Sequence, residues 1–294
     1  MTHPRERHWS ALRAVCAVPA VCGSLVVLGI AFAAAGEWAV LVLAGWLLPA
    51  VALLFRPFER LSVHLVYDYC WPNPDEAATL DPLRRLALQR AGLDDAVADW
   101  YVRRNGEVGV NGFAAGGRSL AVSRGMIEAC QSGRLTEGQA VAMLTHELGH
   151  LVGRATRFNL ALGWLCAPWR ISAGLVGAVV RGIARRAPGA RVGWLLMPVA
   201  GGIAIVQLAQ QGQWPSVAVL VGLGLVVWVQ PLVDAAVSRA SEHAADAYTA
   251  RLGGGADLAA ALREFHDGHS GGRWRASHPP LASRVERLTA APAA

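Results

Sequence analysis

Residues 136–152 read TEGQAVAMLTHELGHLV. Thr136 and Gln139 form a capping-box pattern, in which each side chain can bind a free amide at the start of a helix. The apolar residues that follow recur at helical spacing, at Ala140, Val141, Leu144 and Leu148. The segment therefore predicts an amphipathic helix that begins at Thr136.

Within this helix, His146, Glu147 and His150 form the pattern His-Glu-x-x-His. Residues four apart lie on one helical face, so both imidazoles can reach one metal ion while Glu147 lies beside it. Catalytic zinc takes three protein ligands and a water molecule, whose pKa it lowers to about 7. Glu147 could act as the general base for that water during attack on a peptide carbonyl. The alternative is an amphipathic helix with two satisfied histidines.

A second segment, residues 238–246, reads SRASEHAAD and places Glu242 and Asp246 four residues apart on another predicted helix. The alanines of this segment permit close packing against another helix. The alternative is a solvated acidic helix face, which so many alanines disfavour. Glu242 can complete a His-His-Glu site, and Asp246 can accept the second N–H of a ligating imidazole. We expect one zinc ion per chain.

The composition indicates a membrane protein. Of the 294 residues, 54% are hydrophobic and 16% are charged, against about 45–50% and 25% in soluble domains. All 27 basic residues are arginine, and the net charge is +6. These arginines form no basic stripe interleaved with aromatic residues, so we expect no nucleic-acid partner. The five cysteines contain no CxxC pair, which disfavours a disulfide framework.

Two apolar blocks at the start of the chain, residues 14–35 and 38–55, predict a transmembrane hairpin within residues 1–55. Arg56 and Arg60 follow it. Because positive residues favour the cytoplasmic side, both ends of the hairpin are expected in the cytoplasm.

Three more apolar blocks follow at residues 158–180, 192–209 and 216–233. If the polar segments on both sides fold together, two of the three blocks span the membrane. Arginines after the first block favour the second and third as spans, with the first at the interface or re-entrant, but the other pairings stay open. The total is then about four transmembrane helices.

The chain resembles the HtpX-type membrane zinc metalloproteases, which are gluzincins and relatives of the CAAX prenyl endopeptidases. The resemblance covers nearly the whole chain: the apolar hairpin, Asn-Gly-Phe-Ala from residue 111, HELGH, the apolar insert, SRASEHAAD and His-Pro-Pro-Leu-Ala-Ser-Arg from residue 278. It implies that Glu147 is the general base and that zinc is bound by His146, His150 and Glu242.

The resemblance implies two further features. An edge strand along the cleft, to which a substrate backbone can pair by β-augmentation, would consist of Asn111, Gly112, Phe113 and Ala114. Gly112 stands where the family usually has alanine, which would loosen the strand. His278 would lie near the cleft and could stabilise the developing oxyanion. The alternative for His278 is a structural role at the start of a helix.

The expected fold is a mainly α membrane protein with a cytoplasmic α+β zincin-like metalloprotease domain. The first part of this domain is residues 56–157, the membrane insert is residues 158–233 and the second part is residues 234–294. Short strand candidates at residues 100–103, 108–113 and 120–122, separated by Asn-Gly and Gly-Gly, predict a small antiparallel sheet.

These features predict a multi-pass plasma-membrane zinc endopeptidase with its N-terminus, catalytic domain and C-terminus in the cytoplasm. Its partners would be the lipid bilayer and protein or peptide substrates, in particular membrane or misfolded proteins in quality control. One alternative is a regulatory membrane protease that cleaves a repressor in response to a sensor. Another is a non-catalytic membrane scaffold that keeps the fold, but every expected ligand and base position is filled, which favours an enzyme.

Overall fold

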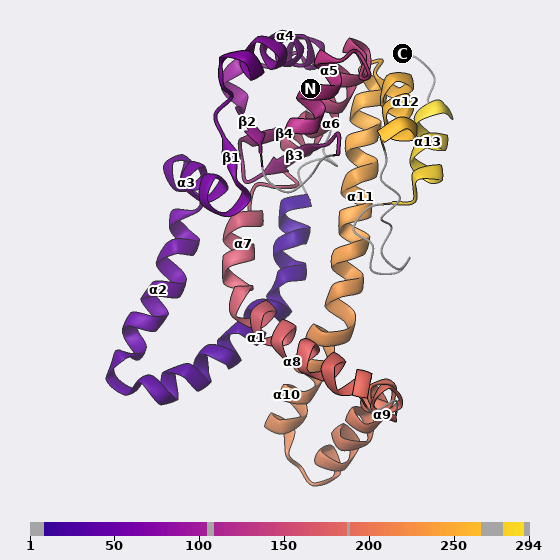
Figure 1. Ribbon diagram of the computed structural model, residues 1–294. Coiled ribbons are helices and arrows are strands. Elements are labelled where there is room, and N and C mark those ends of the chain that lie inside the picture. The colour runs from indigo at the N-terminus through magenta and orange to yellow at the C-terminus, as the bar shows by residue number, and fades with distance from the viewer. Residues whose placement is uncertain (1–8, 105–108, 187–188, 266–278, 291–294) are drawn as a thin grey trace. The chain divides into compact units, whose positions relative to one another are not determined.

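In the computed structural model, the protein is mainly helical with one small sheet (Figure 1). The structure describes residues 9–104, 109–186, 189–265 and 279–290. The chain divides into two compact units, each built from separate stretches of sequence. The sheet unit comprises Met1–Arg13, Val51–Ala161 and Ala235–Ala294, and the apolar unit comprises Ala14–Ala50 and Leu162–Asp234.

The sheet of the sheet unit has four strands in the order β1-β2-β4-β3. They are β1 (Tyr69–Cys70), β2 (Asp99–Arg103), β3 (Gly112–Ala115) and β4 (Ser119–Ser123). The β1–β2 and β3–β4 pairs are antiparallel, but β2 and β4 run parallel. The sheet is therefore mixed, and the prediction of an antiparallel sheet is wrong.

The burial of β4 explains why this strand lies inside the sheet, beside β2. All five of its residues are buried, whereas β3 buries only its last residue. The strand that is most completely covered takes the central place, beside β2, and leaves β3 at the edge. Gly-Gly at residues 116–117 correctly marks the turn of the β3–β4 hairpin. Turn residues do not indicate, however, which strand of the hairpin pairs with β2 or in which direction.

The helices of the sheet unit include α6, which packs against α4, α12 and β3. Their bounds are α3 (Arg56–Tyr67), α4 (Pro74–Ala91), η3 (Asp95–Val97), α5 (Arg124–Gln131), α6 (Glu137–Val152), α12 (Gly255–Phe265) and α13 (Leu281–Ala290). The predicted capping box of α6 is confirmed: Thr136 Oγ1 accepts the Gln139 N–H at 3.3 Å, and Gln139 Oε1 accepts the Thr136 N–H at 2.9 Å.

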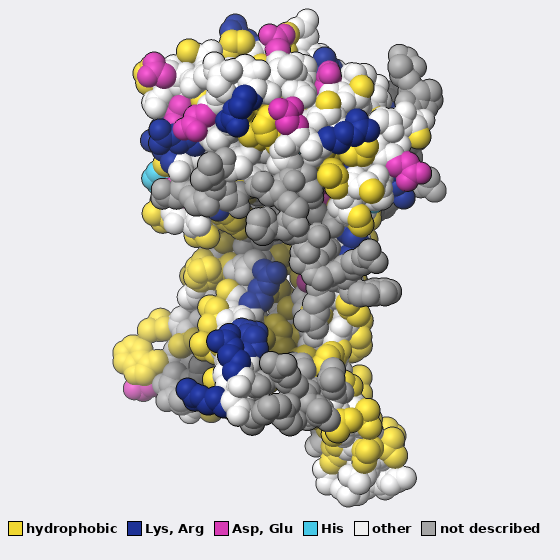
Figure 2. All heavy atoms as spheres, turned by 45° about the vertical axis from the view of Figure 1, so that its right-hand side comes forward, with side chains coloured by type: hydrophobic (Ala, Val, Ile, Leu, Met, Phe, Trp, Pro, Cys, Tyr) yellow, Lys and Arg dark blue, Asp and Glu magenta, His cyan; other side chains and the backbone are white. Residues whose placement is uncertain are grey.

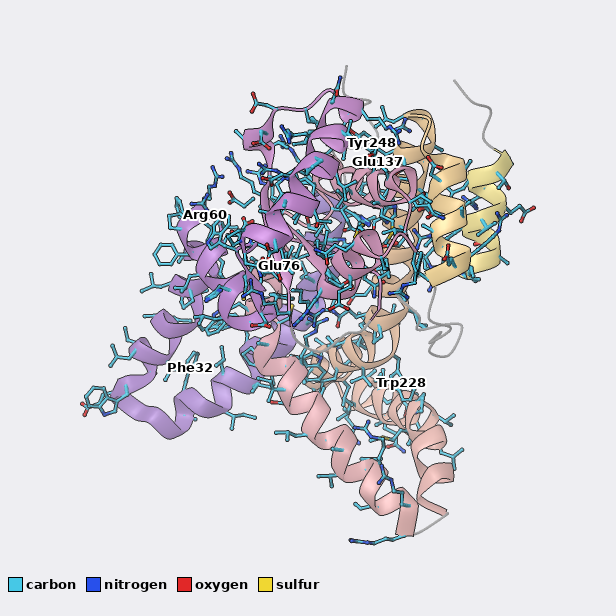
Figure 3. All side chains as sticks on the ribbon, turned by 45° about the horizontal axis from the view of Figure 1, so that its top comes forward. Phe32, Arg60, Glu76, Glu137, Trp228 and Tyr248 are labelled. Atoms are coloured by element: carbon cyan, nitrogen blue, oxygen red, sulfur yellow. The ribbon has the colours of Figure 1, made fainter. Side chains whose placement is uncertain are left out.

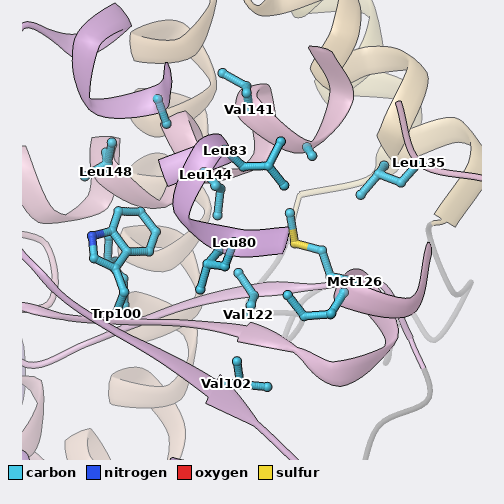
Figure 4. Close-up of a cluster of buried hydrophobic side chains, with 14 of the residues drawn as sticks. Leu80, Leu83, Trp100, Val102, Val122, Met126, Leu135, Val141, Leu144 and Leu148 are labelled. Carbon is cyan, nitrogen blue, oxygen red and sulfur yellow. The ribbon is translucent and has the colours of Figure 1, made fainter. Parts of the chain in front are cut away.

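The main core fixes α6 over the sheet (Figure 4). Leu144 and Leu148 of α6 are fully buried there. Side chains from α4, β2 and β4 complete the cluster, among them Leu80, Leu83, Trp100, Val102 and Val122. Burying one such aliphatic side chain contributes about 1.5–3 kcal/mol, so the apolar face predicted for residues 136–152 is what positions the HELGH segment.

The apolar unit consists of helices whose surfaces are largely hydrophobic. On the face shown in Figure 2, this unit displays many hydrophobic side chains and a group of basic ones, whereas acidic and basic side chains are both spread over the sheet unit. Its elements are α1 (Trp9–Ala35), η2 (Gly36–Trp38), α2 (Ala39–Ala52), α7 (Asn159–Leu165), α8 (Ala167–Arg186), α9 (Gly189–Gln210), α10 (Trp214–Gly224) and a π-helical turn, η4 (Leu225–Val229). The next helix, α11 (Gln230–Arg251), continues into the sheet unit.

Within the described residues, two helices are long and apolar enough to cross a membrane, Trp9–Ile30 and Trp214–Arg251. The number rises to four if each of two interrupted pairs is one span: Gly36–Ala52 with Arg56–Tyr67, and Asn159–Leu165 with Ala167–Ile183. Leu196–Gln210 is a shorter apolar helix. These helices are compatible with membrane insertion.

Candidate metal centre

Two helices of the sheet unit, α6 and α11, bring the three predicted ligands together. Nε2 of His146 lies 3.5 Å from Oε2 of Glu242, and Nε2 of His150 lies 3.3 Å from Oε1 of the same carboxylate. One ligand atom from each residue lies within 4.8 Å of the others. Both histidines are buried, and two imidazole nitrogens with one carboxylate oxygen are a donor set that suits zinc. The three residues could therefore hold a metal ion.

The close approach of α6 and α11 depends on Gly149, inside the HELGH segment. A Cβ added to Gly149 would lie 3.2 Å from Cα of Ala245 and 3.2 Å from Cδ1 of Tyr248. A larger side chain at Gly149 or Ala245 would push the two helices apart and separate the histidines from Glu242. The small residues around Glu242 and Asp246 thus allow the close helix packing that was predicted from the sequence.

Asp246 lies behind His146, with 3.1 Å between Oδ1 and Nδ1. Burial alone would lower the pKa of His146, but the carboxylates of Asp246 and Glu242 outweigh burial and raise that pKa to about 9. The cluster therefore favours a positive charge between the imidazoles and the carboxylates. In the metal-free chain a proton can supply this charge, and a divalent cation fits the same requirement.

Arg284 of α13 belongs to the same cluster, although it was not among the site residues predicted from the sequence. Its Nε and Nη2 donate to Oδ2 and Oδ1 of Asp246 at 2.8 and 2.6 Å, and its Nη1 lies 3.5 Å from Oε2 of Glu242. Arg284 is only 6% exposed. A buried bidentate guanidinium fixes the orientation of its carboxylate partner. Among many arginines, the only signal for Arg284 is its place in the segment after His278.

Glu147 lies against the edge strand of the sheet. A Cβ added to Gly112 of β3 would lie 2.7 Å from Cγ and 3.1 Å from Oε1 of Glu147. The glycine thus allows β3 to pass directly over the Glu147 side chain, which is a more specific effect than the looser strand expected from sequence. Burial raises the pKa of Glu147, and the nearby His146 and His150 oppose that rise.

Glu59 of α3 fixes the turn between β3 and β4. Its carboxylate accepts the N–H groups of Gly117 and Arg118 at 3.0 and 2.9 Å and the hydroxyl of Ser119 at 2.8 Å. Glu59 is 6% exposed, and Gly116 (φ 62°) leaves no room for a Cβ beside it. The sequence pattern does not reveal this anchor, because two of its three partners are backbone groups.

The structure therefore gathers most of the residues singled out from the sequence. The residues around the metal centre are His146, Glu147, His150, Glu242 and Asp246. Gly112, Phe113 and Ala114 lie in β3, and the Asn111 N–H donates to Ser123 Oγ at the start of that strand, at 3.0 Å. His278 lies outside the described residues.

Comparison with known proteins gives one match and one negative result. The sequence model of Peptidase family M48 matches residues 83–291, which include α6, α11, α13 and β3. No curated protein matches the chain. Because the family match covers well over half of the chain, and because a possible metal site lies within it, this protein belongs to Peptidase family M48 and is a metallopeptidase.

Proposed function

We propose that this metallopeptidase is an HtpX-like zinc endopeptidase of the plasma membrane, with Glu147 as the general base. The observation that carries the proposal is the convergence of His146, His150 and Glu242, with Glu147 on the same helix as the two histidines. Zinc, rather than another metal, is proposed from the donor set of two imidazoles and one carboxylate.

A bound zinc ion would supply a water molecule of lowered pKa and polarise the scissile carbonyl. Glu147 accepts a proton from the attacking water and donates it to the leaving amine. The Asp246 carboxylate, 3.1 Å from Nδ1 of His146, favours the orientation of that ring in which Nε2 is free to bind the metal. Arg284 holds the Asp246 carboxylate in place for this task.

Binding of substrate is assigned to the outer edge of β3. Among the described strands β3 is paired only with β4, so an extended peptide can add to its other edge by β-augmentation. Asn111, Gly112, Phe113 and Ala114 would supply the backbone for this pairing, and Gly112 brings the strand next to Glu147. His278, through its place in the resemblance, is proposed to stabilise the developing oxyanion.

The proposed substrates are membrane or misfolded proteins, and the proposed location of the active site is the cytoplasmic side of the membrane. The apolar helices support membrane insertion. Arg56 and Arg60 bind Asp99 of β2 and so belong with the sheet unit. If α2 spans the membrane, the positive-inside rule then places the sheet unit in the cytoplasm.

The decisive experiment is to purify the full chain and its Glu147→Gln variant in detergent and to measure metal content and cleavage of an unfolded protein. We expect about one zinc per chain in both. Loss of the general base lowers the cleavage rate about 10²–10⁴-fold. Glu137→Gln makes the same change at an exposed position of α6 (labelled in Figure 3) and should leave both measurements unchanged. A fully active Glu147→Gln protein would show that another group is the base.

The quality-control role needs a test in cells. Membrane proteomes of cells with the intact protein and with Glu147→Gln would be compared. Substrates should accumulate only with the variant. Identical proteomes would contradict a housekeeping role in membrane protein turnover.

A further inference from the structure

Helix α3 has its charged side chains on the face that packs on the protein and its apolar side chains on the face that points away. At helical spacing, Arg56, Glu59, Arg60 and Val63 lie on one face, whereas Phe58, Leu61 and Leu65 lie on the opposite face. An amphipathic helix of a soluble domain shows the reverse arrangement. The unusual orientation of α3 therefore needs a cause.

The inner face of α3 is held by charged contacts within the sheet unit. Arg56 and Arg60 each bind Asp99 of β2 through two hydrogen bonds of 2.6–3.1 Å, and Figure 3 labels Arg60. Glu59 binds the β3–β4 turn, and Val63 is fully buried against a small cluster that includes Tyr69. With these contacts in place, α3 cannot rotate its apolar face into the protein.

The outer face of α3 is strongly exposed. The exposed fractions are 50% for Phe58, 53% for Leu61 and 72% for Leu65. The exposed apolar surface continues before the helix, at Leu54 and Phe55. Clustered apolar surface of this kind marks a binding surface, since a folded chain in water otherwise covers it.

The chain itself indicates what covers this face. Only three residues, all apolar, separate the end of the apolar helix α2 from the start of α3. A helix that follows a membrane segment so closely begins at the membrane surface, where amphipathic helices lie with their apolar face in the lipid. Phe58 adds an exposed aromatic side chain to this face, of the kind that favours the membrane interface.

We propose that α3 lies in the bilayer–water interface, with Phe58, Leu61 and Leu65 in the lipid at the boundary of headgroups and acyl chains. This inference rests on the proposed membrane location and identifies α3 as a surface of the protein that contacts the lipid. Because Glu59 ties the β3–β4 turn to the opposite face of the same helix, the edge strand is anchored to the lipid surface through α3.

The test uses the full chain in phosphatidylcholine nanodiscs, with the native cysteines replaced by serine and a nitroxide at Leu61→Cys or Leu65→Cys. Collisions with oxygen, which enters lipid, are compared with collisions with a nickel chelate, which stays in water. Gln89→Cys on the exposed side of α4 is the water control, and Val219→Cys on the apolar helix α10 is the lipid control. We expect the oxygen-to-nickel ratio at positions 61 and 65 to be several-fold above that at 89.

Each other outcome overturns the proposal in a distinguishable way. Nickel access at 61 and 65 equal to that at 89, with 219 in lipid, refutes the interfacial helix and leaves the membrane location intact. Exclusion of both reagents would mean that a protein surface, such as a second copy, covers α3. Water access at 219 would refute the membrane location as well.

A second measurement does not depend on cysteine replacement. A photoreactive benzoylphenylalanine is placed at Leu61 or Leu65 in the otherwise unchanged chain. Mass spectrometry should then detect cross-linked phosphatidylcholine, and the same group at Gln89 should give none. Protein–protein cross-links alone at positions 61 and 65 would refute the proposal.

Discussion

Helices α6 and α3 belong to the same unit and are both amphipathic, yet they turn opposite kinds of face toward the rest of that unit. α6 buries its apolar residues in the core, and its His146, Glu147 and His150 lie on the side that meets α11 and β3. α3 instead directs its charged residues toward Asp99 and the β3–β4 turn, where Glu59 is buried, and leaves its leucines outside. The difference teaches that periodicity identifies the faces of a helix, but the partners of those faces decide which one is buried.

The largest expected effect compares one leucine from each helix. Leu144→Ala empties a fully buried site in the core and should lower the free energy of unfolding by about 2–5 kcal/mol. Leu65→Ala, at an exposed site of α3, should change it by less than about 0.5 kcal/mol. Thermal unfolding in detergent micelles measures both. Equal losses would mean that the outer face of α3 is packed on protein.

The next effect concerns Asp99, which holds the charged face of α3. Burial would raise the pKa of this carboxyl, but hydrogen bonds from Arg60 and Arg56 outweigh burial and lower the pKa to about 2. Because this value lies below the ordinary 3.8, the carboxylate stabilises the fold above about pH 4, and that stabilisation is lost as the pH falls toward 2. Asp99→Asn should cost about 1.5–3 kcal/mol at neutral pH.

Unfolding of both proteins over a pH series checks this prediction. The variant should lack the part of the acid destabilisation that Asp99 causes between pH 4 and 2. The loss of stability in Asp99→Asn should be near the lower end of the expected range, because Arg56 and Arg60 are 38% and 43% exposed and water can replace their lost hydrogen bonds. Unchanged stability at neutral pH would show that the contacts of Glu59 and Val63 alone hold α3.

A third prediction tests the partners of α6. Arg284→Ala frees the Asp246 carboxylate that orients His146 and should weaken zinc binding about 10–100-fold, as outer-sphere substitutions do. Arg284→Lys should recover part of the affinity, since it keeps the charge but loses the bidentate geometry. Competition with a zinc chelator measures the affinity independently of cleavage. Full affinity in the alanine variant would contradict the positioning role of Arg284.

The smallest effect is expected where the strand anchored by α3 passes over α6. Gly112→Ala adds a Cβ 2.7 Å from Cγ of Glu147, so the carboxylate must move. Displacement of a catalytic group by a fraction of an ångström should lower kcat about tenfold, with zinc content unchanged. Gly133→Ala serves as a control, because a Cβ there meets nothing within 4 Å, although its positive φ adds some backbone strain. An unchanged kcat for Gly112→Ala would show that Glu147 has room to adjust.

How far the sequence predicted the fold depends on the range of the contacts involved. The capping box, the helix over residues 137–152 and the β3–β4 turn follow from residues within a few positions of one another. The order of the strands does not, because β4 lies beside β2 through the burial of both its faces in the assembled sheet. The error in the predicted sheet came from this step.

The metal centre shows the same division. The types of residue and their spacing on each helix predicted which side chains could meet, because donor chemistry and the helical repeat are local properties. Arg284 joins Asp246 across 38 positions, and Glu59 reaches its turn across 58 to 60 positions. No local pattern distinguishes Glu59 from the other acids of the chain, and the only signal for Arg284 is its place in the segment after His278.

The sequence by itself determined the helix of the HELGH segment, the donor set and the apolar character of the long helices outside the sheet unit. These depend on hydrogen bonds, side-chain chemistry and hydropathy that each segment carries wherever it lies. Only the tertiary structure decided that β3 is the edge strand over Glu147, that Arg284 completes the centre and that α3 presents its leucines outward. Each of these depends on the free energy of contacts between distant residues, which exists only once the chain has folded.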